Sequence, residues 1–166
     1  MSMPPYLSNL RAKVGHDLLL LPTVCGLVFD ARGRLLVGRR VDTGTWELVG
    51  GYLDPGEEVA DAVVREVLEE TGVLVRPDRI TGVYTSRLNY PNGDAVSLVS
   101  TTFWCTPIDG EARVNDDESL EVGYFPVDVL PPLPDEHMVR VRDALRGEPA
   151  ARFRRQHSGN PAPGVR

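Results

Sequence analysis

Apolar residues gather in short runs separated by glycine, proline and charged residues, and this pattern predicts a domain that mixes strands and helices. Residues 18–30 are rich in leucine and valine and end at Asp30. Arg32-Gly33-Arg34 then predicts a turn, and residues 35–40 predict the returning strand of a β-hairpin.

The second half of the chain contains further strand-prone runs. They cover residues 73–75, 80–85, 95–105 and 122–125. Asn92-Gly93 lies between two of these runs and is a common pair at the tip of a β-hairpin, so we expect a hairpin there. An acidic loop is expected at residues 116–118.

Two segments have the periodicity of amphipathic helices. Residues 58–71 lack glycine and proline, and Gly72 follows where a helix stop is expected. Their apolar arc consists of Ala60, Val63, Val64, Val67, Leu68 and Thr71, and the opposite arc carries Glu66, Glu69 and Glu70. Residues 134–146 predict a second helix, with Met138, Val141, Ala144 and Leu145 as its apolar positions.

These elements predict a chain with one domain. We expect an N-terminal arm at residues 1–17 that packs on the domain or on a partner subunit, and a domain at residues 18–146. Residues 147–166 contain glycine, proline, arginine and glutamine with few core residues, so we expect a disordered tail.

Composition and charge narrow the function. The formal net charge of −6 argues against binding to a nucleic-acid polymer, which needs a basic surface. Cys25 and Cys105 both lie in apolar runs, which indicates reduced core thiols rather than a zinc site. The apolar stretch Leu18–Leu21 is too short to cross a membrane, so we expect a cytoplasmic protein without membrane contact.

The candidate chemistry lies in the first helix. Glu66, Glu69 and Glu70 are spaced so that they leave one helical face within one turn, and no lysine or arginine lies in their arc. Such a triplet alone is common on solvated surfaces, but here a glycine-rich loop leads directly into the helix. Carboxylates at this density suit Mg²⁺, Mn²⁺ or Ca²⁺ better than zinc. Glu57 lies near the helix start, and Arg65 is spaced to bond Glu69, either as an orienting fork or as an ordinary surface ion pair.

This segment resembles the signature of the Nudix hydrolase family, G-x5-E-x7-R-E-U-x-E-E-x-G-U, where U is a bulky aliphatic residue. Every fixed position matches, at Gly51, Glu57, Arg65, Glu66, Val67, Glu69, Glu70, Gly72 and Val73. With the flanking strands and helix, the resemblance spans residues 18–146. One departure is Val49, which stands where the family often has proline before the double glycine.

The resemblance implies an α/β fold, a Nudix α/β/α sandwich with a mixed central sheet and a loop-helix-loop catalytic motif. It implies Mg²⁺- or Mn²⁺-dependent hydrolysis of a diphosphate bond in a nucleoside diphosphate linked to another moiety X. ADP-ribose, nucleotide sugars, dinucleoside polyphosphates and nucleoside triphosphates all stay open as substrates. By this likeness Glu66, Glu69 and Glu70 are the principal metal ligands, joined by Glu57 and the Gly50 carbonyl, while Arg65 orients the glutamates. A homodimer is expected by analogy.

Residues outside the signature are candidates for substrate contacts. Arg39 and Arg40 end a strand that faces the glycine loop, Trp46 could stack on a base, and Tyr90 lies at the expected hairpin tip. Each has an ordinary structural alternative. Glu118 and Glu121 are candidates for the extra acid that many family members supply. His16 and His137 are expected to be structural or solvated.

Two other functions stay open at this point. A Nudix-like domain that senses a nucleotide without cleaving it is expected to lose a metal glutamate, and none is lost here. A diphosphate isomerase needs further acid/base residues, such as a cysteine in the pocket.

Overall fold

The computed structural model describes residues 5–90 and 92–155. In chain order the elements are α1 (Pro5–Val14), β1 (Leu19–Val28), β2 (Arg34–Arg40), β3 (Trp46–Glu47), α2 (Val59–Thr71), β4 (Leu74–Asn89), β5 (Ala95–Asp109), β6 (Ser119–Pro126), a 3-10 turn at Val127–Val129, α3 (Asp135–Leu145) and β7 (Arg152–Phe153). No helix in this described part is both long and apolar enough to span a bilayer.

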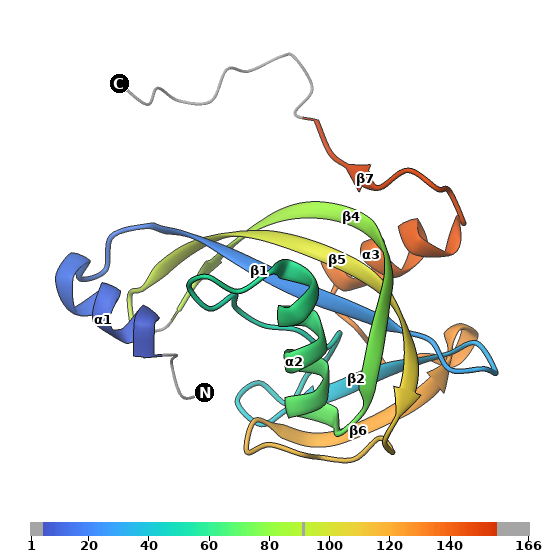
Figure 1. The fold of residues 1–166 in the computed structure, drawn as a ribbon. Coiled ribbons are helices and arrows are strands. Elements are labelled where there is room, and N and C mark those ends of the chain that lie inside the picture. Colours follow the sequence, from blue (N-terminus) through green and yellow to red (C-terminus); the bar gives the residue numbers. More distant parts are fainter. Residues whose placement is uncertain (1–4, 91, 156–166) are drawn as a thin grey trace.

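The strands form two sheets, drawn in Figure 1. A mixed four-stranded sheet has the order β1-β5-β4-β7, in which β1 runs parallel to β5 and β4 runs antiparallel to β5. A smaller antiparallel sheet has the order β3-β2-β6. The predicted α/β class with a mixed sheet is confirmed, as is the hairpin between β4 and β5, where the Tyr90 amide donates to the Asp94 carbonyl at 2.8 Å.

The predicted hairpin between residues 18–30 and 35–40 is wrong. The strand β1 pairs with β5, while β2 pairs with β6. The two segments meet at the turn alone, through the isolated bridge between Phe29 and Leu35 and the bonds between Asp30 and Arg34. The reason is burial, because residues 23–28 are all buried and helices cover both faces of β1. A strand covered on both faces takes its partner from the tertiary packing rather than from the nearest segment in sequence.

The two long helices pack on opposite faces of β1. Val24 and Val28 lie in one core cluster with Val63 and Val67 of α2. The intervening Cys25 and Leu27 lie in a second cluster with residues of α3. Since side chains alternate along a strand, β1 separates the α2 side of the molecule from the α3 side.

The helix α2 begins and ends close to its predicted bounds. Gly72 adopts φ 70°, and its amide donates to the Leu68 carbonyl at 2.9 Å, which confirms the helix stop. The buried face differs from the predicted arc, because Ala62 is buried and Leu68 is 40% exposed. At Gly26 of β1 a Cβ would lie 2.9 Å from a Val67 methyl, so this glycine lets α2 approach the sheet closely.

The N-terminal segment forms α1, which contacts the domain. Leu7 packs in a cluster with Leu21 and Val96, and Arg11 donates to the Ala95 carbonyl at 2.8 Å. At the other end, β7 adds two residues beside β4 within the segment expected to be disordered. Residues 1–4 of the expected arm and 156–166 of the expected tail lie outside the described residues.

Candidate active site

The double glycine before the helix packs between β1 and the carboxylate of Glu66. A Cβ at Gly51 would lie 2.5 Å from the carboxylate atoms of Glu66, and a Cβ at Gly50 would overlap the Val24 carbonyl oxygen. Only glycine at both positions lets the loop pass between β1 and the carboxylates.

Arg65 holds the loop and the helix together. Its Nε and Nη2 atoms donate to the two carboxylate oxygens of Glu57 at 2.8 and 2.9 Å, and Nη2 also donates to the Tyr52 carbonyl at 3.0 Å. Its Nη1 atom donates to Glu66 at 2.9 Å and to Glu69 at 3.1 Å. Hydrogen bonding from Arg65 lowers the pKa of Glu57. One guanidinium therefore fixes three of the four predicted ligand carboxylates.

Glu70 is the fourth predicted ligand carboxylate. It does not pair with Arg65, and it is more deeply buried than Glu66. Burial, reinforced by the charge of Glu66, raises the pKa of Glu70 well above its usual range. Burial also raises the pKa of Glu66, with Arg65 acting against that shift. Two carboxyl groups whose burial disfavours their charged forms lie where an added cation would be stabilising.

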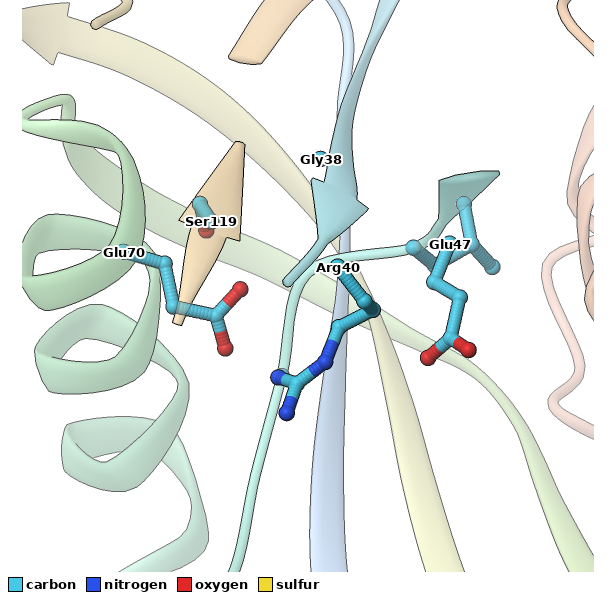
Figure 2. A pocket seen from close by; sticks show the side chains of 7 residues that line it. Gly38, Arg40, Glu47, Glu70 and Ser119 are labelled. Atoms are coloured by element: carbon cyan, nitrogen blue, oxygen red, sulfur yellow. The ribbon is translucent and has the colours of Figure 1, made fainter. Parts of the chain in front are cut away.

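Glu70 of α2 lines a pocket together with residues of the smaller sheet and of the segment that leads into the double glycine. The lining residues are Gly38, Arg40, Glu47, Leu48, Gly50, Glu70 and Ser119. Figure 2 shows the Arg40 side chain between those of Glu70 and Glu47. Arg40 also pairs with Asp42 at 3.3 Å and with Glu118 at 3.2 Å, which orients its guanidinium. The pocket lining thus contains the acidic side chains of Glu47 and Glu70 and the positively charged side chain of Arg40.

The other predicted substrate residues lie elsewhere. Arg39 bonds the Gly44 carbonyl at 3.0 Å and pairs with Glu121 at 3.2 Å, and neither residue lines the pocket. Trp46 packs edge-on against Phe125 in the core, with ring centroids 5.1 Å apart. The Tyr90 hydroxyl meets that of Tyr52 at 3.3 Å, beside α1. Of the six predicted substrate residues, Arg40 lines the pocket, and Glu118 pairs with it.

Sequence reasoning missed several residues of the pocket. Glu47 is half-buried, and burial raises the pKa of its carboxyl group. It stands four residues before Gly51, so its nearness to the signature was the available signal. Ser119 and Gly38 carry no such signal, because pairing between β2 and β6 brings them to the pocket.

The cysteines and histidines were predicted to be structural. Cys25 and Cys105 are free and buried, which confirms the expectation of core thiols, and neither lines the pocket. His16 bonds Asp94 at 2.7 Å, and the Nδ1 atom of His137 accepts from the Leu48 amide at 3.1 Å. The acid/base cysteine that an isomerase would need is therefore not found in this pocket.

The chemistry of the donors suits a divalent cation. All predicted donors are oxygens, as Mg²⁺ and Mn²⁺ prefer, and the glycine loop leaves room for the Glu66 carboxylate. Among residues 5–90 and 92–155, no three acidic, histidine or cysteine side chains converge closely enough to hold an ion. The reason is that Glu57, Glu66 and Glu69 turn toward Arg65, while Glu70 turns into the pocket.

Comparison with known proteins agrees with this geometry. The model of the NUDIX domain matches residues 19–146. A MutT-like protein of Streptomyces ambofaciens is 36% identical over 137 residues, which cover 82% of this chain and 83% of the relative. An ADP-ribose pyrophosphatase of Methanocaldococcus jannaschii is 35% identical over 135 residues, covering 79% and 78%.

A solved structure gives the same result. The crystal structure of an ADP-ribose pyrophosphatase from Streptococcus suis is 27% identical, with a TM-score of 0.60, and the match covers 80% of this chain and 96% of that one. The chain therefore belongs to the Nudix family and is an enzyme of the Nudix pyrophosphohydrolase class.

Proposed function

We propose that this enzyme hydrolyses the diphosphate bond of a nucleoside diphosphate linked to another moiety X, with Mg²⁺ or Mn²⁺ bound to the α2 carboxylates. The observation that carries the proposal is the enclosed pair of Glu66 and Glu70 beside a pocket that also holds Arg40. Acidic groups in excess suit a divalent ion, and the ion together with Arg40 suits a diphosphate.

The ligands would come from both parts of the signature. Glu66, Glu69 and Glu70 would hold the ion, with Glu57 and the Gly50 carbonyl as further oxygens. A bound divalent ion neutralises diphosphate oxygens and lowers the pKa of a water molecule. Arg65 would keep Glu57 and Glu69 oriented through the hydrogen bonds that it already makes.

The chain's own residues account for the remaining steps. Glu70, which lines the pocket beside the proposed ion, would accept the proton of the attacking water. Arg40 would donate to a phosphate oxygen from the opposite wall. The water oxygen bonds to phosphorus as the bond from phosphorus to the bridging oxygen breaks, which yields two phosphate-bearing products.

Two of the compared proteins are ADP-ribose pyrophosphatases, so ADP-ribose is the first compound to assay. Nucleotide sugars, dinucleoside polyphosphates and nucleoside triphosphates complete the panel, with products resolved by ³¹P NMR in Mg²⁺ and in EDTA. We expect metal-dependent cleavage of at least one compound. Tight binding without turnover of any compound would favour a nucleotide-sensing domain and contradict the proposal.

The homodimer and the cytoplasmic location stay predictions. Light scattering coupled to size exclusion tests the first, with twice the 18.3 kDa chain mass expected. Fractionation of the producing cell tests the second.

A further inference from the structure

The active-site pocket contains an acid that the proposed chemistry does not use. Glu47 lines this pocket, and its Oε1 atom accepts from the Thr45 hydroxyl at 3.0 Å. Within the described part of the chain, no cationic nitrogen lies within 4.0 Å of its carboxylate, because Arg40 pairs with Asp42 and Glu118 instead. Glu47 therefore keeps one acceptor oxygen, Oε2, without a partner among the described residues.

Strand register places Glu47 beside a position that has no side chain. Glu47 of β3 pairs with Gly38 of β2, and the side chains of paired residues project from the same face of a sheet. Apart from its chain neighbours, the atoms nearest to a Cβ at Gly38 would be the Ser119 hydroxyl and the Glu121 carbonyl oxygen, both at 3.9 Å. Gly38 is also not among the glycines with a positive φ. Neither the backbone nor the packing requires glycine here, so its effect is to leave room in the pocket.

A second polar group borders this space. Ser119 of β6 is 8% exposed and lines the pocket. Its amide donates to Asp116 at 3.0 Å, whereas its hydroxyl makes no hydrogen bond to the described residues. Buried hydroxyl groups in native proteins are normally hydrogen-bonded, so this one is available to a ligand.

The size and the lining of the pocket limit what can enter. The space between the lining residues is about 250 Å³, part of it open to solvent, which suits one part of a nucleotide rather than the whole. The described lining residues include no aromatic ring, and Trp46 packs against Phe125 in the core, so a nucleobase would have no ring to stack on. An ionised carboxylate only accepts hydrogen bonds, so Glu47 repels phosphate oxygens and suits donors such as sugar hydroxyls.

The order of the charged groups matches a sugar joined to a phosphate. Figure 2 shows the Arg40 side chain between those of Glu70 and Glu47. With the proposed ion at Glu70 and a phosphate oxygen at Arg40, the group joined to that phosphate meets Glu47. In a nucleoside diphosphate linked to X, this group is either the ribose of the nucleoside or a sugar of X.

We propose that Glu47 and Ser119 bind the hydroxyl groups of a sugar ring joined to the diphosphate, and that Gly38 provides the room for this ring. The inference rests on the proposed function and names the part of the substrate, next to the diphosphate, that the pocket recognises. The free oxygen of Glu47 accepts from a sugar hydroxyl, and the Ser119 hydroxyl can either donate or accept.

Binding of ribose 5-phosphate tests the subsite without hydrolysis, because this probe has no diphosphate bond. Ribose 5-phosphate and inorganic phosphate are titrated with Mg²⁺ at about pH 8, well above the ordinary pKa of a carboxyl group, and ¹H–¹⁵N shifts give each Kd. We expect ribose 5-phosphate to bind about tenfold more tightly than phosphate, and Glu47→Gln to reduce this preference to about twofold. The control Glu136→Gln removes an exposed acid outside the pocket and should keep the preference.

Gly38→Ala tests the room for the ring while leaving both acids in place. Its methyl group would have no close neighbour, so we expect the Tm and the affinity for inorganic phosphate to stay at wild-type values. The affinity for ribose 5-phosphate should fall by about fivefold, because the methyl group occupies the space of the ring. A wild type without preference for ribose 5-phosphate, or a preference that survives both Glu47→Gln and Gly38→Ala, would overturn the proposal.

Hydrolysis assays then identify which sugar is bound. ADP-ribose and its analogue with a 2′-deoxyadenosine half have the same sugar in X and differ at the ribose of the nucleoside. An equal loss of kcat/KM for both compounds in Glu47→Gln, by about tenfold, assigns the subsite to the sugar of X, and a loss confined to ADP-ribose assigns it to the nucleoside. No loss with either compound would contradict the subsite. A wild type that prefers ribose 5-phosphate but cleaves no diphosphate would count against the proposed function alone.

Discussion

Arg65 and Arg140 are two guanidinium groups on opposite sides of one strand, and their surroundings are opposite. Arg65, on the α2 side, contacts the carboxylates of Glu57, Glu66 and Glu69. Arg140, on the α3 side, contacts one serine hydroxyl and no carboxylate of the described chain. The first arginine has more acids around it than it can neutralise, whereas the second has none.

The difference lies in the charged groups that each side of the molecule leaves without an ion-pair partner. On the α2 side Glu70 has no bond to Arg65, and burial together with Glu66 raises the pKa of its carboxyl group. On the α3 side a surplus of positive charge remains at Arg140. We propose that a divalent cation completes the first side, so added metal ions test it.

The largest effect is expected at Glu70. We predict that Glu70→Gln lowers kcat on a diphosphate substrate by about 10²- to 10⁴-fold, because the amide can neither accept the proton of water nor hold a cation as a carboxylate does. Steady-state kinetics in Mg²⁺ measures this. Glu58→Gln, which changes an exposed acid just before the same helix, is the matched control and should retain the wild-type rate. A wild-type kcat in Glu70→Gln would show that Glu70 has no role in catalysis.

Arg65 is expected to act through the acids that it holds. We predict that Arg65→Lys lowers kcat, or raises the Mg²⁺ concentration for half-maximal rate, by about 10- to 100-fold, since an ammonium cannot replace the paired bonds to Glu57. Metal titrations of the rate separate the two effects. Arg76→Lys changes an arginine that pairs only at the surface with Asp78 and serves as control. If the rate of both variants depends on Mg²⁺ concentration in the same way, Arg65 makes an ordinary ion pair and does not position the metal ligands.

Arg40 and Arg39 are neighbours in sequence with different surroundings. We predict that Arg40→Gln raises KM for a diphosphate substrate by about tenfold, because one charge-assisted hydrogen bond to phosphate is lost. Arg39→Gln should change KM less than about twofold, because Arg39 bonds Gly44 and Glu121 outside the pocket. Equal effects of the two variants would contradict the assignment of Arg40.

How much the sequence predicts differs between the two sides of the sheet. The signature predicted α2, its stop at Gly72 and the acids around Arg65, because those contacts are local or lie within one loop and helix. It missed Ser119 and Gly38, which strand pairing brings to the pocket, and it predicted a hairpin where β1 joins β5 instead. On the α3 side, periodicity placed Leu145 in the core, yet Leu145 is 46% exposed and Arg140 is buried. The contacts of α3 with the sheet, such as that of Arg140 with Ser100, decide that exchange, and no local pattern encodes them.

The smallest effect concerns His137, a residue of α3 that accepts from the amide of the pocket residue Leu48. Burial, and then Arg140, lowers the pKa of His137 from 6.5 to about 4. The unfolded chain therefore binds the proton more readily, so stability is present above pH 6.5 and declines as pH falls toward 4. From pH 6 to pH 5 the free energy of unfolding should fall by up to about 1 kcal/mol through this group.

Urea unfolding at several pH values measures that decline. His137→Gln keeps an acceptor for the Leu48 amide and should flatten the slope, whereas the exposed His16→Gln should leave the His137 contribution in place. An unchanged slope in His137→Gln would show that another group governs stability in this range.

The central claim is that the α2 carboxylates form a site for a divalent cation, and electron paramagnetic resonance of added Mn²⁺ tests it most directly. The account predicts that wild-type protein removes the free Mn²⁺ signal in proportion to its concentration, that Mg²⁺ restores the signal by competition, and that Glu66→Gln with Glu70→Gln abolishes the binding. Equal binding by the folded double variant and the wild type, or no binding by the wild type with a diphosphate substrate present, would contradict it.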